Sequence, residues 1–172
     1  MTRLVLSVVG SDRPGLTKAL AAAVLKAGGN WLESHLSQLG GLYVGSVLVE
    51  LAPGQEAALR AAVSAVDAEG LEVRMAPAAA SVEVSGETFS FSLVGQDRPG
   101  IVDQVTAVLS GLGANIESFN TRLSEEPHSG APLFHLAASL RLPAGLSAAK
   151  VQDALEAISG EIMVDVTVSA AA

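Results

Sequence analysis

The chain has 172 residues, of which 49% are hydrophobic and 16% charged, and 10 Lys+Arg against 18 Asp+Glu give a formal net charge of -8 at pH 7. This composition excludes a disordered chain, the lack of an apolar run of ~18–20 residues excludes a membrane-spanning helix, and the lack of cysteine excludes disulfides and thiolate chemistry. The basic residues are too few for the clustered positive surface that a phosphate backbone requires, so we expect no direct contact with nucleic acid or with a membrane.

From its first residues we expect no targeting signal at the beginning of the chain. Its first ten residues contain one arginine and a short apolar run, and Asp12, Arg13 and Pro14 follow where a cleavage site would lie. The lack of cysteine is compatible with a reducing compartment. We therefore expect no signal peptide and a cytoplasmic location.

The first half of the chain predicts the element order strand, helix, strand, strand, helix, strand. Apolar residues spaced on one helix face predict the first helix, which ends at Gly28-Gly29. Two alternating segments, 31–39 and 42–51, flank a pair of glycines and predict a hairpin. A second apolar helix face over 59–66 predicts another helix, and alternation over 71–75 predicts the last strand.

The chain contains an internal repeat at an offset of 85 residues. Gly10-Ser-Asp-Arg-Pro-Gly15 recurs as Gly95-Gln-Asp-Arg-Pro-Gly100, and Gly28-Gly-Asn30 recurs as Gly113-Ala-Asn115. Apolar positions on both sides of the loop match at the same offset, so composition alone does not explain the similarity. We infer a tandem duplication.

Each half predicts a βαββαβ unit, so the fold class is α+β with two ferredoxin-like domains in tandem. The first domain is expected over 1–80 and the second over 86–170, with an Ala-rich linker over 76–80. Each domain should contain an antiparallel four-stranded sheet with both helices on one face. The exposed sheet edges of such small domains favour association, so we expect a homodimer.

The loop repeated at the first strand–helix junction is the strongest candidate site. Proline disfavours helical backbone in the residue before it, so each helix is predicted to begin at the proline, with the aspartate accepting hydrogen bonds from first-turn amides. The free N–H groups of such a turn favour a carboxylate or a phosphate. A helix start without any ligand is the alternative. The candidate residues are Ser11, Asp12, Pro14, Gly15, Gln96, Asp97, Pro99 and Gly100.

Asn30 and Asn115 follow the residues that end the first helix of each half. An asparagine can simply tolerate a left-handed turn there, but its repetition favours a ligand contact in which the amide reaches the mouth of the loop. Glu33 and Glu117 follow and are expected on a solvated face. The first half has one more residue between the asparagine and the glutamate, which predicts a bulge or a slipped register.

The remaining residues show no catalytic or metal-binding pattern. The glycine spacing of the loop is that of a P-loop, but Leu16 and Ile101 stand where the phosphate-binding lysine is needed. His35, His128 and His135 have no partner at metal-ligand spacing, so we expect no metal and no cofactor. No nucleophile elbow is present. The sequence therefore predicts a binding protein and not an enzyme.

The negative charge is concentrated in residues 81–172, which carry four basic and eleven acidic side chains. Charge of this kind keeps an Ala-rich chain soluble. A basic protein surface as partner is the alternative explanation.

A βαββαβ unit in which Asp-Arg-Pro-Gly opens the first helix and Gly-x-Asn precedes the second strand resembles the ACT domain, and both halves carry this pattern. The resemblance implies a module that senses an amino acid, of the glycine or serine class, and controls glycine or amino-acid metabolism through a protein partner such as a transcription factor or a metabolic enzyme. It also implies a ligand at an interface between two domains. The loop of one domain and the asparagine of its neighbour would hold that ligand, with Ser11 to Gly15 and Asn30, and Gln96 to Gly100 and Asn115, as the matching positions.

Two other functions stay open. A free regulatory subunit of an amino-acid biosynthetic enzyme would use the same binding residues. Acylphosphatases share the βαββαβ topology and hold phosphate with an arginine and the first strand–helix loop, which Arg13 with Asn30, or Arg98 with Asn115, would imitate. The proline in each loop removes one amide from that phosphate cradle, so a hydrolase is less favoured.

Overall fold

The computed structural model describes residues 1–67, 70–79, 87–126, 129–158 and 163–168. The chain divides into two compact units, Met1–Ser81 and Val82–Ala172, and each has its own sheet, helices and core. None of the helices in the described ranges is long and apolar enough to cross a membrane.

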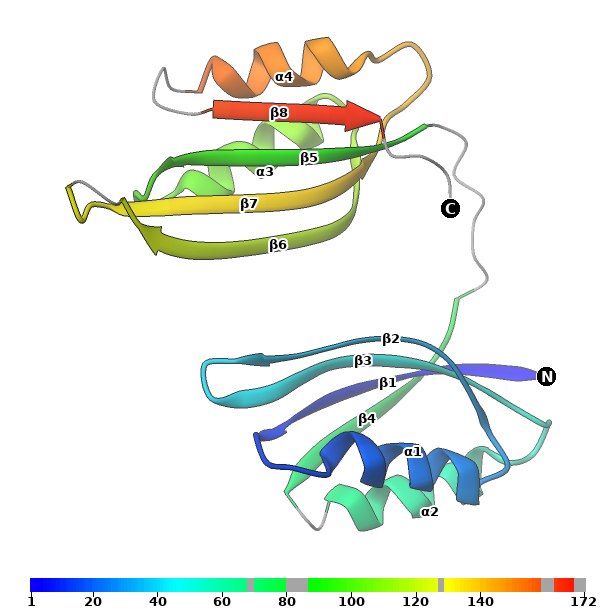
Figure 1. Ribbon diagram of the computed structural model, residues 1–172. Coiled ribbons are helices and arrows are strands. Elements are labelled where there is room, and N and C mark those ends of the chain that lie inside the picture. The colour runs from blue at the N-terminus through cyan, green and yellow to red at the C-terminus, as the bar shows by residue number, and fades with distance from the viewer. Residues whose placement is uncertain (68–69, 80–86, 127–128, 159–162, 169–172) are drawn as a thin grey trace. The chain divides into compact units, whose positions relative to one another are not determined.

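The first unit is a four-stranded antiparallel sheet with two helices on one face (Figure 1). The sheet order is β2-β3-β1-β4, so β3 separates the two strands that α1 connects. The elements in chain order are β1 (Thr2–Ser11), α1 (Leu16–Lys26), β2 (Asn30–Leu39), β3 (Leu42–Leu51), α2 (Glu56–Asp67) and β4 (Leu71–Pro77).

The second unit repeats this arrangement with the sheet order β6-β7-β5-β8. Its strands also pair antiparallel. The prediction of two ferredoxin-like βαββαβ units in tandem is therefore confirmed. The elements in chain order are β5 (Thr88–Gln96), α3 (Ile101–Gly111), β6 (Asn115–Glu125), β7 (Pro132–Arg141), α4 (Ala148–Glu156) and β8 (Met163–Val168).

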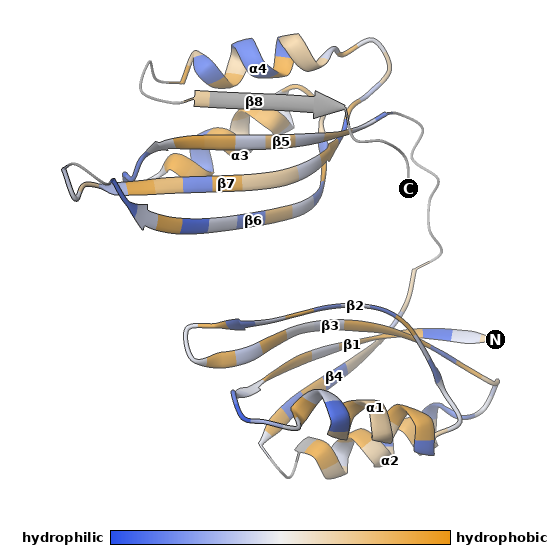
Figure 2. Cartoon of the chain, in the orientation of Figure 1, coloured by the Kyte–Doolittle hydropathy of each residue, from blue (hydrophilic) through white to orange (hydrophobic). Residues whose placement is uncertain are grey.

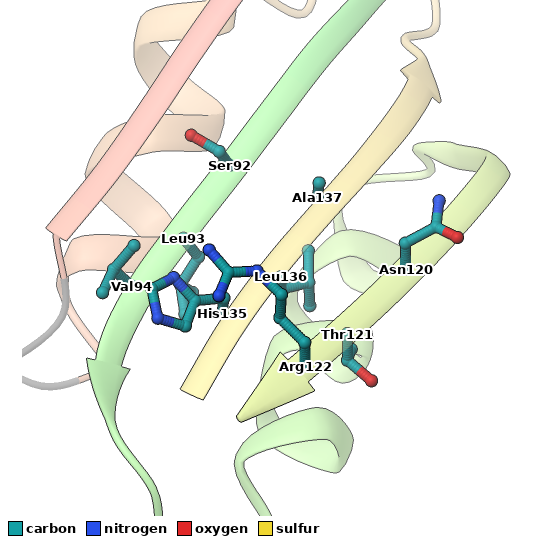
Figure 3. A pocket seen from close by; sticks show the side chains of 9 residues that line it. All are labelled: Ser92, Leu93, Val94, Asn120, Thr121, Arg122, His135, Leu136 and Ala137. Atoms are coloured by element: carbon teal, nitrogen blue, oxygen red, sulfur yellow. The ribbon is translucent and has the colours of Figure 1, made fainter. Parts of the chain in front are cut away.

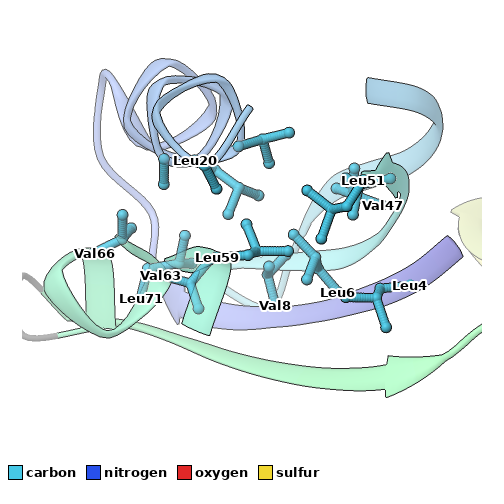
Figure 4. Packing of buried hydrophobic residues seen from close by; sticks show 14 of the residues in the cluster. Leu4, Leu6, Val8, Leu20, Val47, Leu51, Leu59, Val63, Val66 and Leu71 are labelled. Carbon is cyan, nitrogen blue, oxygen red and sulfur yellow. The ribbon is translucent and has the colours of Figure 1, made fainter. Parts of the chain in front are cut away.

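Alternate side chains of each sheet point toward the helices and form two separate cores. Fully buried residues include Leu6, Leu20 and Leu59 in the first unit (Figure 4) and Phe91 and Leu109 in the second. The helices carry hydrophilic residues next to hydrophobic ones, as expected when one helix face is buried (Figure 2). Burial of each such side chain stabilises the fold by roughly 1.5–3 kcal/mol, so each unit is held together by its own core.

The structure corrects the predicted helix starts and the start of the linker. α1 and α3 begin at Leu16 and Ile101, two residues after the prolines, because Gly15 and Gly100 adopt left-handed φ angles of 97° and 84° that a helix does not contain. β4 extends through Pro77, so the predicted linker over 76–80 begins inside a strand, and residue 80 lies outside the described residues.

Both β2 and β6 carry a β-bulge at the same place in the repeat, at Leu32 and at Glu117. Glu33 therefore follows the bulge and pairs with Leu48 in the sheet, whereas Glu117 is itself the bulged residue. The bulge predicted for the first half is confirmed, but the second half carries one as well, so Glu33 and Glu117 are not at equivalent positions. The offset of 85 residues continues through both bulges.

Candidate functional site

The two repeated loops have the same backbone geometry. Gly15 and Gly100 stand directly before α1 and α3, and a glycine at this position offers no side-chain hydrogen bond to the helix. By contrast, α4 is capped by Ser147, whose hydroxyl oxygen accepts a hydrogen bond from the Lys150 N–H at 3.4 Å. No side-chain cap therefore covers the first-turn amides of α1 and α3, although the Ile101 N–H donates to the Arg98 carbonyl at 3.4 Å. The helix dipole favours an anion at such a terminus.

The predicted capping role of the two loop aspartates was wrong. Among the hydrogen bonds of the described residues, neither carboxylate accepts from a first-turn amide of its helix. Their backbone N–H groups hold the loops instead, because Asp12 donates to the Gly41 carbonyl at 3.4 Å and Asp97 donates to the Pro132 carbonyl at 3.0 Å. The aspartates thus fix the path of each loop through the main chain.

The loop residues lie at the ends of β1 and β5 and are exposed. Ser11 pairs with Leu42 at the last position of β1, and Gln96 pairs with Leu133 at the last position of β5. Pro14 and Pro99 follow in the turn that precedes each helix and are exposed as well. The structure therefore brings the predicted loop residues of each unit together at one end of its sheet.

Arg98 fastens the second loop to the helix that follows it. Its Nη2 donates a hydrogen bond to Gln104 Oε1 at 2.8 Å. This contact holds the guanidinium beside α3.

Asn30 lies at the end of its sheet opposite to the loop of its own unit. It opens β2 opposite Glu50, and Glu50 pairs with Arg3 near the start of β1, whereas the loop follows Ser11 at the end of β1. The eight-residue step from Arg3 to Ser11 covers about 26 Å at roughly 3.3 Å per strand residue. Asn115 occupies the same place in the second unit. The prediction that the amide reaches the mouth of the loop was therefore wrong within one unit.

The same separation argues against an acylphosphatase site, which needs the loop arginine and the asparagine close together. Arg98 belongs to the loop after β5, whereas Asn115 opens β6 at the other end of the sheet. Arg13 and Asn30 are separated in the same way in the first unit. One unit therefore cannot place its arginine and its asparagine on a single acyl phosphate.

Ion pairs that sequence reasoning missed lie beside both asparagines. Arg3 Nε donates to Glu50 Oε1 at 3.0 Å on the strand pair next to Asn30. In the second unit Arg141 pairs with Glu117 at 2.6 Å, so Glu117 is bound and not simply solvated as predicted. The register of strand pairing brings these partners together, and this register cannot be predicted from the spacing of the residues along the chain.

The histidines make local contacts. His35 Nε2 lies 3.1 Å from Glu33 Oε1, and His135 Nε2 lies 2.6 Å from Ser124 Oγ. His128 lies outside the described residues. Within the described ranges no three His, Cys, Asp or Glu side chains are grouped so that they could hold a metal ion.

The chain is similar to known proteins over one unit and over its whole length. Residues 2–76 match the family model of the ACT domain. The "Glycine cleavage system transcriptional repressor" of Escherichia coli (strain K12) is 24% identical over an alignment of 171 residues. The aligned parts cover 92% of this chain and 85% of that protein.

Two crystal structures share the fold of the entire chain. A protein of unknown function from Galdieria sulphuraria is 28% identical with a TM-score of 0.85, covering 98% of this chain and 99% of that one. A candidate glycine cleavage system transcriptional repressor is 18% identical with a TM-score of 0.71, covering 98% of each chain. Residues 2–76 thus match the ACT domain, and the chain as a whole, with its two βαββαβ units, is similar to the glycine cleavage system transcriptional repressor.

Proposed function

We propose that this chain is a non-catalytic regulatory protein of the cytoplasm that binds a free amino acid of the glycine or serine class and controls glycine or amino-acid metabolism at the level of transcription. The observation that carries the proposal is the loop geometry, which leaves the first-turn amides of α1 and α3 without a side-chain cap in both units. The similarity to a transcriptional repressor over 92% of the chain supports the regulatory part.

The loops suit the carboxylate of an amino acid. The N-terminus of a helix offers unpaired N–H groups and the positive end of the dipole, and both favour a negative group. Gly15 and Gly100 have no side chain that could cover these amides, and a Cβ added to either would meet nothing within 4 Å. A ligand can therefore approach the backbone of each loop closely.

The asparagines suit the ammonium group. The side-chain oxygen of Asn30 or Asn115 is a hydrogen-bond acceptor on an exposed strand start. Because each asparagine lies about 26 Å along the sheet from the loop of its own unit, one ligand can be held by both only if they come from different units. Ligand binding would then depend on how units associate, which is a direct route from binding to regulation.

A thermal-shift screen of the twenty amino acids tests this proposal. A ligand that binds only the folded state stabilises it by RT ln(1 + [L]/Kd), about 2.7 kcal/mol at a concentration of 100 Kd. We expect a shift with glycine or serine, and none with glycinamide, which lacks the carboxylate, or with N-acetylglycine, which lacks the ammonium. No shift with any of the twenty would overturn the proposal.

Affinity purification of the full chain then identifies the partner. Because the net charge of -8 disfavours direct binding to nucleic acid, we expect to recover a transcription factor, and more of it in one of the two ligand states. Recovery of an amino-acid biosynthetic enzyme would instead identify the chain as a free regulatory subunit.

A further inference from the structure

The second unit has a cavity on the sheet face that the helices do not cover. Its volume is about 300 Å³, and none of the site residues predicted from the sequence lines it. β5, β6 and β7 contribute neighbouring residues to it (Figure 3). The lining residues are Ser92, Leu93, Val94, Asn120, Thr121, Arg122, His135, Leu136 and Ala137.

Small side chains make room for this cavity. Ser92, Ala137 and Asn120 form one row across β5, β7 and β6, because Ser92 pairs with Ala137 and Ala137 pairs with Asn120. A neighbouring hollow of about 250 Å³ shares these three residues and continues along the same face. A ligand can therefore lie along the strands directly against the sheet.

Arg122 provides the cavity with a positive charge. It pairs with His135 across β6 and β7, and Figure 3 shows its side chain reaching from β6 over β7 toward that histidine. Arg98 binds Gln104 and Arg141 pairs with Glu117, whereas Arg122 makes no hydrogen bond or ion pair within the described part of the chain. Its guanidinium has donors for two oxygens of a carboxylate.

His135 has a fixed place beside this arginine. Its Nε2 lies 2.6 Å from Ser124 Oγ, so a neighbouring residue of β6 holds the ring on the open face. The ring is only half-buried and lines the cavity with the guanidinium. The two side chains thus form one polar end, while Val94 and Ala137 offer apolar surface next to it.

The first unit lacks this polar end although it has the same framework. Its equivalent strand pair places Ser37 opposite Val44, and Val44 pairs with Val9 just as His135 pairs with Val94. The duplicated sheets therefore differ where the arginine and the histidine stand.

We propose that the open-face cavity of the second unit, built around Arg122 and His135, binds a small monocarboxylate with a short apolar body. One unpaired guanidinium balances one negative charge, and the second half of the chain, with four basic and eleven acidic residues, disfavours a dianion such as phosphate. The volume of about 300 Å³ is large enough for a carboxylate whose apolar body has the size of an amino-acid side chain. This site is separate from the loops and does not rest on the proposed function.

An NMR titration of the full chain with 4-methylpentanoate tests the proposal, with 4-methylpentanamide as the uncharged probe of the same shape. We expect saturable shifts at residues 92–94, 120–122 and 135–137 with the carboxylate. The amide and the variant Arg122→Gln should each lose about tenfold to a hundredfold in affinity, since a hydrogen bond between charged groups is lost. Arg60→Gln, which removes an exposed arginine on α2, is the matched control and should bind normally.

A second variant keeps the test independent of the arginine. Ala137→Leu adds bulk to the floor of the cavity and should abolish the same shifts without changing the fold, because Ala137 is exposed. Equal binding of carboxylate and amide, or wild-type affinity in either variant, would overturn the proposal. The proposal would also be overturned if the wild-type chain did not bind the carboxylate and the Arg122→Gln variant had a different molar mass from the wild type in light scattering. That result would assign this sheet face to contact with a second copy of the chain. A normal amino-acid thermal shift in Arg122→Gln would show that the loop site is unaffected.

Discussion

Two glycines with positive φ differ in what surrounds them. Gly45, with φ 149°, lies in β3 where an added Cβ would collide with the backbone carbonyl of His35, whereas Gly15 has open space around it. The first position requires glycine for close approach of two strands, and the second requires it for the backbone angle alone.

We therefore expect unequal effects of the same substitution at these two glycines. Gly15→Ala should lower the free energy of unfolding by about 1 kcal/mol, the cost of a left-handed backbone. Gly45→Ala should lower it by about 2–4 kcal/mol, because β2 and β3 must also move apart. Urea unfolding of both variants measures the difference, and equal losses would show that contact with His35 does not matter.

Glu56 shows how a single carboxyl group makes stability depend on pH. Its own backbone amide at the start of α2, the Thr2 side chain and the Gly54 amide hydrogen bond to the carboxylate and lower the pKa of Glu56. Because the folded pKa is the lower one, the stabilisation is present above the ordinary glutamate pKa and is lost as the pH falls through the folded value.

Glu56→Gln should consequently lower the Tm at neutral pH. The difference from the wild-type Tm should shrink as the pH falls through the lowered folded pKa of Glu56, below which the carboxyl group is protonated in both states. Thermal unfolding of both proteins over a series of decreasing pH values measures this. A Tm difference that does not change with pH would mean that the hydrogen bonds of Glu56 do not depend on its charge.

At the scale of whole elements, α4 begins differently from α1 and α3. α4 has a serine cap, while α1 and α3 begin after a left-handed glycine without help from the loop aspartate. Ser147→Ala should therefore cost about 1 kcal/mol of stability, and Asp12→Ala should change it by less than about 0.5 kcal/mol. Denaturant unfolding separates the two, and a large loss in Asp12→Ala would restore the aspartate as a cap.

The sequence predicts the elements of this fold better than it predicts the site. Hydrophobic periodicity and the repeat suffice for the element order, because both depend on residues close together in the chain. Which end of the sheet holds Asn30, and which side chain lies opposite Arg122, depends on the pairing register. The connection between β6 and β7 is longer than that between β2 and β3, which hides that register in the second half, and the bulge at Glu117 shifts it again.

At the scale of the whole molecule, each sheet ends in strands with one unpaired side. β2 and β4 are the outer strands of the first sheet, and β6 and β8 are those of the second. Unpaired strand edges favour association, so we expect a homodimer with twice the chain mass of 17.4 kDa. Light scattering at micromolar concentration measures it, and a mass of 17.4 kDa would show a monomer.

Titration calorimetry with the amino acid found in the thermal-shift screen tests the central claim most directly. The claim is that the loop amides hold the carboxylate and that Asn30 and Asn115 hold the ammonium. Asn30→Ala and Asn115→Ala should each weaken the site to which they contribute by about tenfold to a hundredfold, with unchanged folding, because one charge-assisted hydrogen bond is lost at an exposed residue. Wild-type affinity in both variants and in the double variant would contradict the account and leave the asparagines as turn residues only.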